Sequence, residues 1–303
     1  MSIAVILLQQ LIIMVLLMAA GYLMFKGKKI SLEGSRSLAN ILVYLCLPCV
    51  IIKGFLVEQT TQATIGLLIS AVAAAVTLGA AMWISRIFFR KDAVANFASA
   101  FSNAGFFGVP LITACISDGA TFYVAAFIAF LNLLQWTYGV DLLTGGRGKL
   151  SLKKVITAPF MIAILIGLFF YFSGIAMPHI LLQCVNFLAG CNTPIAMFTI
   201  GIYLAQTSAT AMFKKKVLYG VSAVRLILIP LVTLALLSLL PAAYMEMKMA
   251  ILIAAACPVG SNVAVYAHLH DRNYPYAVET VVISTILSLI SIPLLMALAQ
   301  MVW

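Results

Sequence analysis

Two polar stretches containing glycine and proline interrupt long apolar runs of the sequence. One reads Ser102-Asn-Ala-Gly-Phe-Phe-Gly-Val-Pro110 and the other reads Cys257-Pro-Val-Gly-Ser-Asn262. Inside a membrane, such a break is tolerated only where its backbone is buried in protein or lines a hydrated cavity. The N–H groups that begin the following half-helix attract anions, and an amide side chain adds two donors without burying a charge. The two breaks therefore predict an anion-binding site.

The candidate substrate-binding residues are the polar and small residues of these breaks. They are Ser102, Asn103, Gly105, Gly260, Ser261 and Asn262, with Gly108, Pro110 and Pro258 as helix-breaking positions. The alternative is structural, because glycine and proline are common in membrane helices and asparagine joins neighbouring helices. For a single break the two interpretations are balanced. Two breaks at corresponding positions, each with asparagine, favour binding.

Two further charged residues are candidates for coupling or for attracting substrate. Glu279, at the start of an apolar segment, either binds a coupling proton or has a structural role, as a helix cap or as the partner of Arg272 at the membrane interface. Arg225 lies several residues into another segment, where it attracts substrate, extends to the cytoplasmic side or binds a helix end. These alternatives stay open.

Motifs for metal binding and catalysis are weak or absent. The run from His268 to Asp271 imitates a metal cluster, but its spacing would place the two rings on opposite sides of a helix, so we predict a cytoplasmic loop and no metal. Cys46-Leu-Pro-Cys49 has redox spacing but lies in an apolar segment, which favours packing. The sequence lacks HExxH, Gly-x-Ser-x-Gly and P-loop motifs. We therefore predict neither an enzyme nor an ATP-driven pump, and no cofactor.

The composition places these candidate residues in a membrane protein. Of 303 residues, 64% are hydrophobic and 9% are charged, and the mean hydropathy is +1.15. Globular proteins are about half apolar and a quarter charged. The formal charge of +10 comes from short basic clusters between apolar runs. This pattern indicates membrane topology and not a nucleic-acid-binding surface.

The apolar runs predict an all-α protein with ten membrane segments. The segments cover roughly 3–25, 35–56, 63–88, 95–116, 120–140, 155–176, 179–205, 217–240, 246–267 and 275–302. The first is too long for the core of a signal peptide and follows no basic stretch, so we expect it to be retained as a membrane helix.

Basic residues indicate the orientation of these segments. With the N-terminus outside, every lysine and arginine lies on the cytoplasmic side except Lys53 and Arg225, in or near the membrane, and Lys248, in an outside loop. Both termini are therefore predicted outside the cytoplasmic membrane. Five segments in 1–140 and five in 155–303, joined by the short cytoplasmic loop 141–154, would form an inverted repeat with the breaks in the fourth and ninth segments.

The second and seventh segments support this repeat weakly. Each has an asparagine eight residues before a proline within the segment. The prolines are Pro48 and Pro194, which we expect to kink their helices.

Five motifs along the chain resemble those of one family. They are Leu38–Pro48, Ser102–Leu111, Arg225–Pro230, Cys257–Asn262 and Ser284–Pro293. Together they resemble the auxin efflux carrier family, which includes bacterial organic-acid permeases and plant PIN-type auxin carriers. The resemblance extends over nearly the whole chain, and Asn103 and Asn262 match the polar positions of the family's crossover.

This resemblance implies a fold like that of sodium–proton antiporters. A scaffold of helices 1, 2, 6 and 7 would hold a transport domain of helices 3–5 and 8–10, in which helices 4 and 9 cross at the substrate. The transport domain would move past the scaffold like an elevator. The plant carriers have a long loop where this chain has 141–154, so the chain resembles the bacterial type. Malate or malonate is therefore the expected kind of substrate, and we expect a homodimer.

The leading prediction is a secondary transporter of small mono- or dicarboxylates, with a proton or sodium ion as possible coupling partner. One alternative is a sodium-coupled symporter of the bile-acid type, and another is a membrane receptor that binds an organic acid without moving it. Import and export stay open, because an inside-negative potential of 100 mV pushes an anion outward by about 2.3 kcal/mol per charge.

Overall fold

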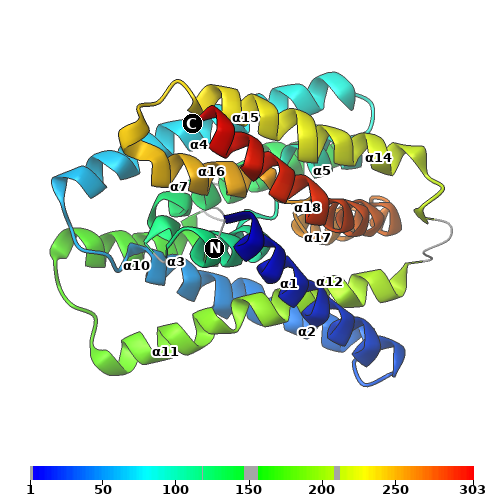
Figure 1. Ribbon diagram of the computed structural model, residues 1–303. Coiled ribbons are helices and arrows are strands. Elements are labelled where there is room, and N and C mark those ends of the chain that lie inside the picture. Colours follow the sequence, from blue (N-terminus) through cyan, green and yellow to red (C-terminus); the bar gives the residue numbers. More distant parts are fainter. Residues whose placement is uncertain (1–2, 118, 147–155, 208–211) are drawn as a thin grey trace.

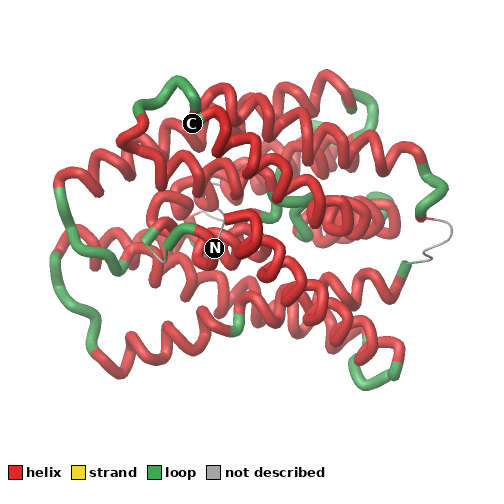
Figure 2. Tube along the Cα trace, in the orientation of Figure 1, coloured by secondary structure: helices red, strands yellow, loops and turns green. Residues whose placement is uncertain are grey.

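The structure is a computed structural model that describes residues 3–117, 119–146, 156–207 and 212–303. Figure 1 shows a bundle of helices, and Figure 2 shows that short loops join them. Within the described ranges there is no strand, only an isolated antiparallel bridge between Ser102 and Val259. The predicted all-α class is therefore confirmed for these residues.

The helices fall in the ranges where apolar segments are predicted, with ends that differ by a few residues. In the first half they are α1 (Ile3–Lys26), α2 (Leu32–Ile41), α3 (Leu47–Phe55), α4 (Thr61–Phe88), α5 (Ala93–Ala100), α6 (Val109–Cys115), α7 (Ala120–Leu134) and α8 (Val140–Thr144). In the second half they are α10 (Pro159–Ser173), α11 (His179–Gly190), α12 (Asn192–Gln206), α14 (Lys216–Ala223), α15 (Ile229–Leu237), α16 (Met245–Ala256), α17 (Asn262–Leu269) and α18 (Tyr274–Val302). The structure also has short π-helical turns, η1 (Leu42–Cys46), η2 (Ala104–Gly108), η3 (Gln135–Gly139) and η4 (Val224–Leu228), and the 3-10 turn η5 (Ala242–Tyr244).

Seven helical runs in the described residues are long and apolar enough to cross a membrane. They are Ile6–Lys26, Leu32–Phe55, Thr61–Phe88, Ala120–Thr144, His179–Gln206, Lys216–Leu237 and Tyr274–Val302. Two shorter apolar helices cover Ala104–Cys115 and Pro159–Ser173. Large apolar side chains on the outside, such as Trp83 at 67% exposure and Phe187 at 76%, suit a lipid environment. The chain is a polytopic membrane protein.

Proline explains three of the four π-helical turns. A proline has no N–H, so the carbonyl four residues earlier loses its helical partner. Before Pro110, the Val109 N–H instead bonds to the carbonyl of Ala104, five residues back. The turns before Pro48 and Pro230 bond in the same way. Pro48 therefore lies in the first turn of α3, directly after a π turn, and such turns are frequent near functional sites.

The helices pack in two groups (Figure 1). In one, α1 lies along α12, and α3 packs on α10 and α11. A Cβ at Gly21 or Gly201 would collide with the backbone of the opposite helix, so glycine is needed for this approach. In the other, α4 packs on α5, α7 and α15, and α18 packs on α14 and α17. The groups meet where α1 contacts α6 and α18 and where α3 contacts α7.

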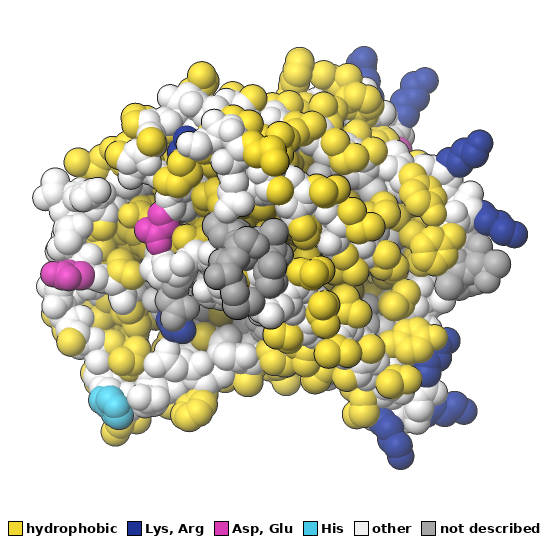
Figure 3. Space-filling model, in the orientation of Figure 1, with side chains coloured by type: hydrophobic (Ala, Val, Ile, Leu, Met, Phe, Trp, Pro, Cys, Tyr) yellow, Lys and Arg dark blue, Asp and Glu magenta, His cyan; other side chains and the backbone are white. Residues whose placement is uncertain are grey.

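Basic side chains gather at one end of the molecule, where α1 and α12 finish and α14 begins (Figures 1 and 3). Lys26 and Lys216 lie there and are exposed. The predicted basic cluster at 147–154 lies outside the described residues.

The prediction that Lys248 lies in an outside loop is wrong. Helix α16 already begins at Met245, so Lys248 lies in its first turn and is 3% exposed. Its ammonium group donates to the Leu240 carbonyl at 3.3 Å and lies 4.4 Å from the centre of the Trp303 ring. The long side chain therefore packs against neighbouring segments instead of extending into water.

Candidate functional site

The two breaks lie side by side at the centre of the second helix group and bond to each other. The Asn103 N–H donates to the Pro258 carbonyl at 2.8 Å, and the Gly260 N–H donates to the Phe101 carbonyl at 3.0 Å. Ser102 lies opposite Val259 in the antiparallel bridge. Each break thereby supplies hydrogen-bond partners for backbone groups of the other. Buried backbone groups need such partners, so the helices can be interrupted here.

Small residues allow this close contact. A Cβ at Gly260 would lie 3.0 Å from the Ser102 carbonyl oxygen, so the backbone of the first break would have to shift to make room for it. In the π turn that follows the first break, a Cβ at Gly105 would lie 3.0 Å from Leu47, and one at Gly108 would lie 3.0 Å from the Cys257 sulfur. Pro110 follows in the first turn of α6.

Arg225 joins the C-terminal ends of the helices that precede both breaks. It lies in the π turn η4 and is 1% exposed. Its Nη1 donates to the carbonyls of Ser99 and Ala100, at 3.1 and 3.0 Å, and its Nη2 donates to the Ala255 carbonyl. Arg225 therefore binds helix ends, one of the three predicted alternatives. Its charge compensates the negative ends of two helix dipoles.

The backbone of the second break is also held from α18. The Val259 N–H donates to the Ser284 hydroxyl at 3.0 Å. Ser261 follows as the residue before α17; it is buried, and its carbonyl accepts from the Ala264 N–H at 3.1 Å. The break is therefore fixed by α5, α18 and its own helix.

The two asparagines differ in their surroundings. Asn103 is 4% exposed and its Nδ2 has no hydrogen-bond partner, and the neighbouring Ser102 hydroxyl also has none. Asn262 is half-buried, and its Nδ2 donates to Gln135 Oε1 at 2.8 Å. The Nε2 of Gln135, which is fully buried in the π turn η3, has no partner. Buried donors of Ser102, Asn103 and Gln135 thus have unused hydrogen-bonding capacity at or beside the crossing, and the Nε of Arg225 also has no partner.

Gln135 is the residue of this group that the sequence analysis missed. Its signal is a polar amide within the fifth apolar segment, where burial demands a partner. Asn192 on α12 is a second such amide, since its Nδ2 donates to the Gly105 carbonyl at 3.2 Å and its Oδ1 has no partner.

The prediction that Pro194 kinks its helix at mid-segment is wrong. The chain turns at Cys191, between α11 and α12, and Pro194 is the third residue of α12. In the first helical turn the missing proline N–H costs no helical hydrogen bond. The bend therefore lies just before the proline.

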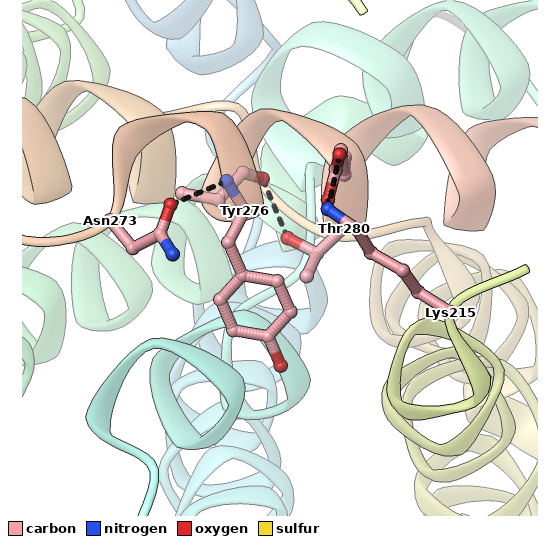
Figure 4. A network of polar contacts seen from close by, with 6 residues as sticks. Lys215, Asn273, Tyr276 and Thr280 are labelled. Carbon is pink, nitrogen blue, oxygen red and sulfur yellow. Dashed lines mark hydrogen bonds and ion pairs between the residues drawn. The ribbon is translucent and has the colours of Figure 1, made fainter. Parts of the chain in front are cut away.

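Glu279 pairs with Lys215 and not with Arg272 (Figure 4). The Lys215 Nζ lies 2.7 Å from Oε1 and 2.6 Å from Oε2 of this carboxylate. Arg272 donates instead to the Leu143 carbonyl at 2.5 Å, because it precedes α18 and faces α8. Glu279 does not cap α18 either, since the Asn273 side chain accepts from the Tyr276 N–H at 3.1 Å.

The remaining motifs take ordinary structural places. His268 lies in the last turn of α17, so the predicted loop begins later, at His270. The described residues hold no group of three or more potential metal ligands. Cys46 and Cys49 are buried free thiols.

Comparisons with known proteins identify a family of membrane transporters. The family model described as "Membrane transport protein" matches residues 6–152 and 148–296. A "Putative malonate transporter" of Rhizobium meliloti is 26% identical over 274 residues, which are 84% of each chain. An "Uncharacterized transporter" of Methanothermobacter thermautotrophicus is 28% identical over 205 residues, 65% of each chain. The chain therefore belongs to the membrane transport protein family, the auxin efflux carrier family that its motifs resemble.

Proposed function

We propose that this protein is a secondary transporter of small organic anions, mono- or dicarboxylates, that bind at the crossing of the two broken helices. The observation that carries the proposal is the joint arrangement of Arg225 and the unpartnered amides. Arg225 occupies the three carbonyls at the helix ends, while Asn103 and Gln135 keep donor groups without partners. Unsatisfied buried donors suit a ligand rich in acceptors, such as a carboxylate.

Electrostatics favour the same ligand. The carbonyl ends of α5 and α16 each carry about half a negative charge, which would repel an anion from the crossing. The buried guanidinium of Arg225 opposes both ends. The N–H groups that follow the breaks then attract an anion without a second fixed cation.

The proposed architecture has ten membrane helices in two inverted repeats, 1–140 and 155–303. The first helix group, α1 to α3 and α10 to α12, would be the scaffold, and the second would be the transport domain. The extensive packing of α1 on α12 and of α3 on α10 within one group, and of α4 on α5 and α7 within the other, supports this division. The side-chain contacts Arg36–His268, Gln206–Tyr274 and Asn192–Gly105 join the groups and would change in an elevator movement.

Malonate is the first substrate to test, because it is the acid in the name of the Rhizobium meliloti relative. Malate and monocarboxylates follow. We infer that the basic end faces the cytoplasm, with both termini outside and the protein in the cytoplasmic membrane as a homodimer. The Lys215 pair favours a structural role for Glu279, and coupling to protons or sodium is a separate question for transport assays.

The test is uptake of labelled mono- and dicarboxylates into proteoliposomes at varied pH, sodium and membrane potential. The proposal predicts saturable uptake that Asn103→Ala strongly reduces. Uptake that requires sodium would favour the symporter alternative. Binding of the acid without counterflow would favour the receptor alternative.

A further inference from the structure

A groove on the outside of the second helix group takes no part in the proposed anion site. It has a volume of about 460 Å³ and lies between the run α14–α15 and α18. Leucine and isoleucine form most of its walls, whereas Ser222, Ala223 and Ser291 are small. Small side chains opposite large ones leave the hollow, which an apolar ligand would fill.

The two serines of the groove have unused hydrogen-bonding capacity. Hydroxyls in a membrane helix usually bond to a carbonyl one turn back, as Ser288 does to Thr285 at 2.7 Å. Ser222, which is 2% exposed, and Ser291 have no hydrogen-bond partner. A ligand that fills this groove therefore gains from carrying an oxygen acceptor along an otherwise apolar chain.

The length of the groove fits one leaflet of a bilayer. On α14–α15 its lining extends from Tyr219 to Leu231, about 18 Å at 1.5 Å per residue. On α18 it extends from Leu287 to Leu298, a similar distance. The hydrocarbon core of a bilayer is about 30 Å thick, so each leaflet contributes roughly half of it. The acyl chain of a phospholipid has this length and chemistry.

The basic end of the molecule lies beside the groove and supplies positive charge for the phosphate of a phospholipid headgroup. Lys216 begins α14 and lies one turn before Tyr219 and two turns before Ala223 on the same helix face. Lys214 and Lys216 are exposed, while Lys215 is held by Glu279. Basic side chains next to a membrane segment attract anionic lipids. A lipid in the groove would place its phosphate beside these lysines.

We propose that the groove between α14–α15 and α18 is a binding site for an anionic phospholipid. One acyl chain lies in the groove, an ester oxygen accepts from a serine hydroxyl, and the phosphate lies between Lys214 and Lys216. The lipid would fill the space between two helices whose contact includes η4, the turn that carries Arg225.

The test is native mass spectrometry of the delipidated full-length protein, titrated with phosphatidylglycerol or with phosphatidylcholine of the same acyl chains. We expect one retained phosphatidylglycerol per chain, with at least tenfold less phosphatidylcholine at equal concentration. Ala223→Phe, which fills the groove, and the double variant Lys214→Gln/Lys216→Gln should each reduce phosphatidylglycerol retention at least fivefold. The matched control, Lys28→Gln/Lys29→Gln, removes two exposed lysines elsewhere at the basic end and should retain the lipid.

Two results would overturn the proposal. One is equal retention of the two lipids. The other is full retention of phosphatidylglycerol by Lys214→Gln/Lys216→Gln, whose exposed positions make the variant usable even if Ala223→Phe fails to fold. Neither result bears on carboxylate transport, because the readout is lipid binding.

Discussion

At the first break, Asn103 has a buried amide nitrogen without a partner and is followed by a π turn that leads to Pro110. At the second break, the proline lies inside the break, and Asn262 begins the next helix with its amide bonded to Gln135. The two backbones nevertheless complete each other through the same short bridge. The crossing is therefore similar in its backbone and unequal in its side chains.

Because of this difference, we expect the two asparagines to contribute unequally to anion binding. A donor that already has an intramolecular acceptor must share it or exchange it when a ligand binds, whereas an unpartnered donor gains a full hydrogen bond. Asn103 should therefore contribute more to anion binding than Asn262. Arg225 is common to both breaks, because its guanidinium bonds to the helix end before each of them.

Replacing Arg225 should have the largest effect. Arg225→Met leaves three buried carbonyls without this donor, at a cost of about 1–3 kcal/mol for each unsatisfied group. We expect loss of folded protein in fluorescence-detected size exclusion after heating. Arg225→Lys should restore only part of the lost stability, since one ammonium group cannot reproduce the planar set of donors of the guanidinium group. The control Arg86→Met changes an exposed arginine, and equal stability of the two methionine variants would refute the joining role.

The second-largest effect should come from the asparagine variants, and the two should differ from each other. A hydrogen bond to a charged group contributes about 1.5–3 kcal/mol, so Asn103→Ala should weaken carboxylate affinity about 10- to 100-fold. Asn262→Ala should weaken it less, because part of its bonding serves Gln135. Isothermal titration with malonate in detergent measures both. A larger loss for Asn262→Ala would reverse the proposed inequality.

Gln135 should have a smaller effect that depends on Asn262. Gln135→Ala removes the unpartnered Nε2 donor and also the acceptor that orients the Asn262 amide, so we expect affinity to fall several-fold. The double variant with Asn262→Ala should lose less than the sum of the single losses, because contacting residues are coupled. Strict additivity of the two losses would show that their hydrogen bond is irrelevant to binding.

The Lys215–Glu279 pair should have the smallest effect. The lysine side chain is 45% exposed, and partly exposed ion pairs contribute about 1 kcal/mol or less. Glu279→Gln should lower thermal stability slightly, and Lys215→Gln should lower it more, because it leaves the buried Glu279 carboxylate without its partner. The pH dependence of malonate uptake should keep the wild-type shape in both. A flattened pH profile in Glu279→Gln alone would instead make this carboxylate the coupling group.

Local patterns in the sequence predicted the helices and both breaks well. The predicted segment 95–116 is one apolar run interrupted by polar and small residues, and the structure interrupts it between α5 and η2. Hydrophobic runs and glycine or proline signals act over a few residues, so they can be read without a fold. The unlike environments of Asn103 and Asn262 could not be read in this way.

Partners distant in sequence explain what the sequence did not specify. Arg225 binds carbonyls about 125 residues before it and 30 residues after it, and only the folded bundle selects this alternative from three. Lys215 meets Glu279 because α14 packs along α18, which sequence spacing does not reveal. Lys248 was assigned to a loop because the sequence shows its charge. Its burial against neighbouring segments depends on the fold.

The most direct test of anion binding at the crossing is counterflow of labelled malonate in proteoliposomes, normalised to incorporated protein. Wild type should exchange malonate, and Asn103→Ala should lower the initial rate at subsaturating malonate about tenfold or more. Asn40→Ala, the same substitution at an exposed position of α2, should exchange at the wild-type rate. Wild-type exchange by Asn103→Ala would contradict the assignment of the site.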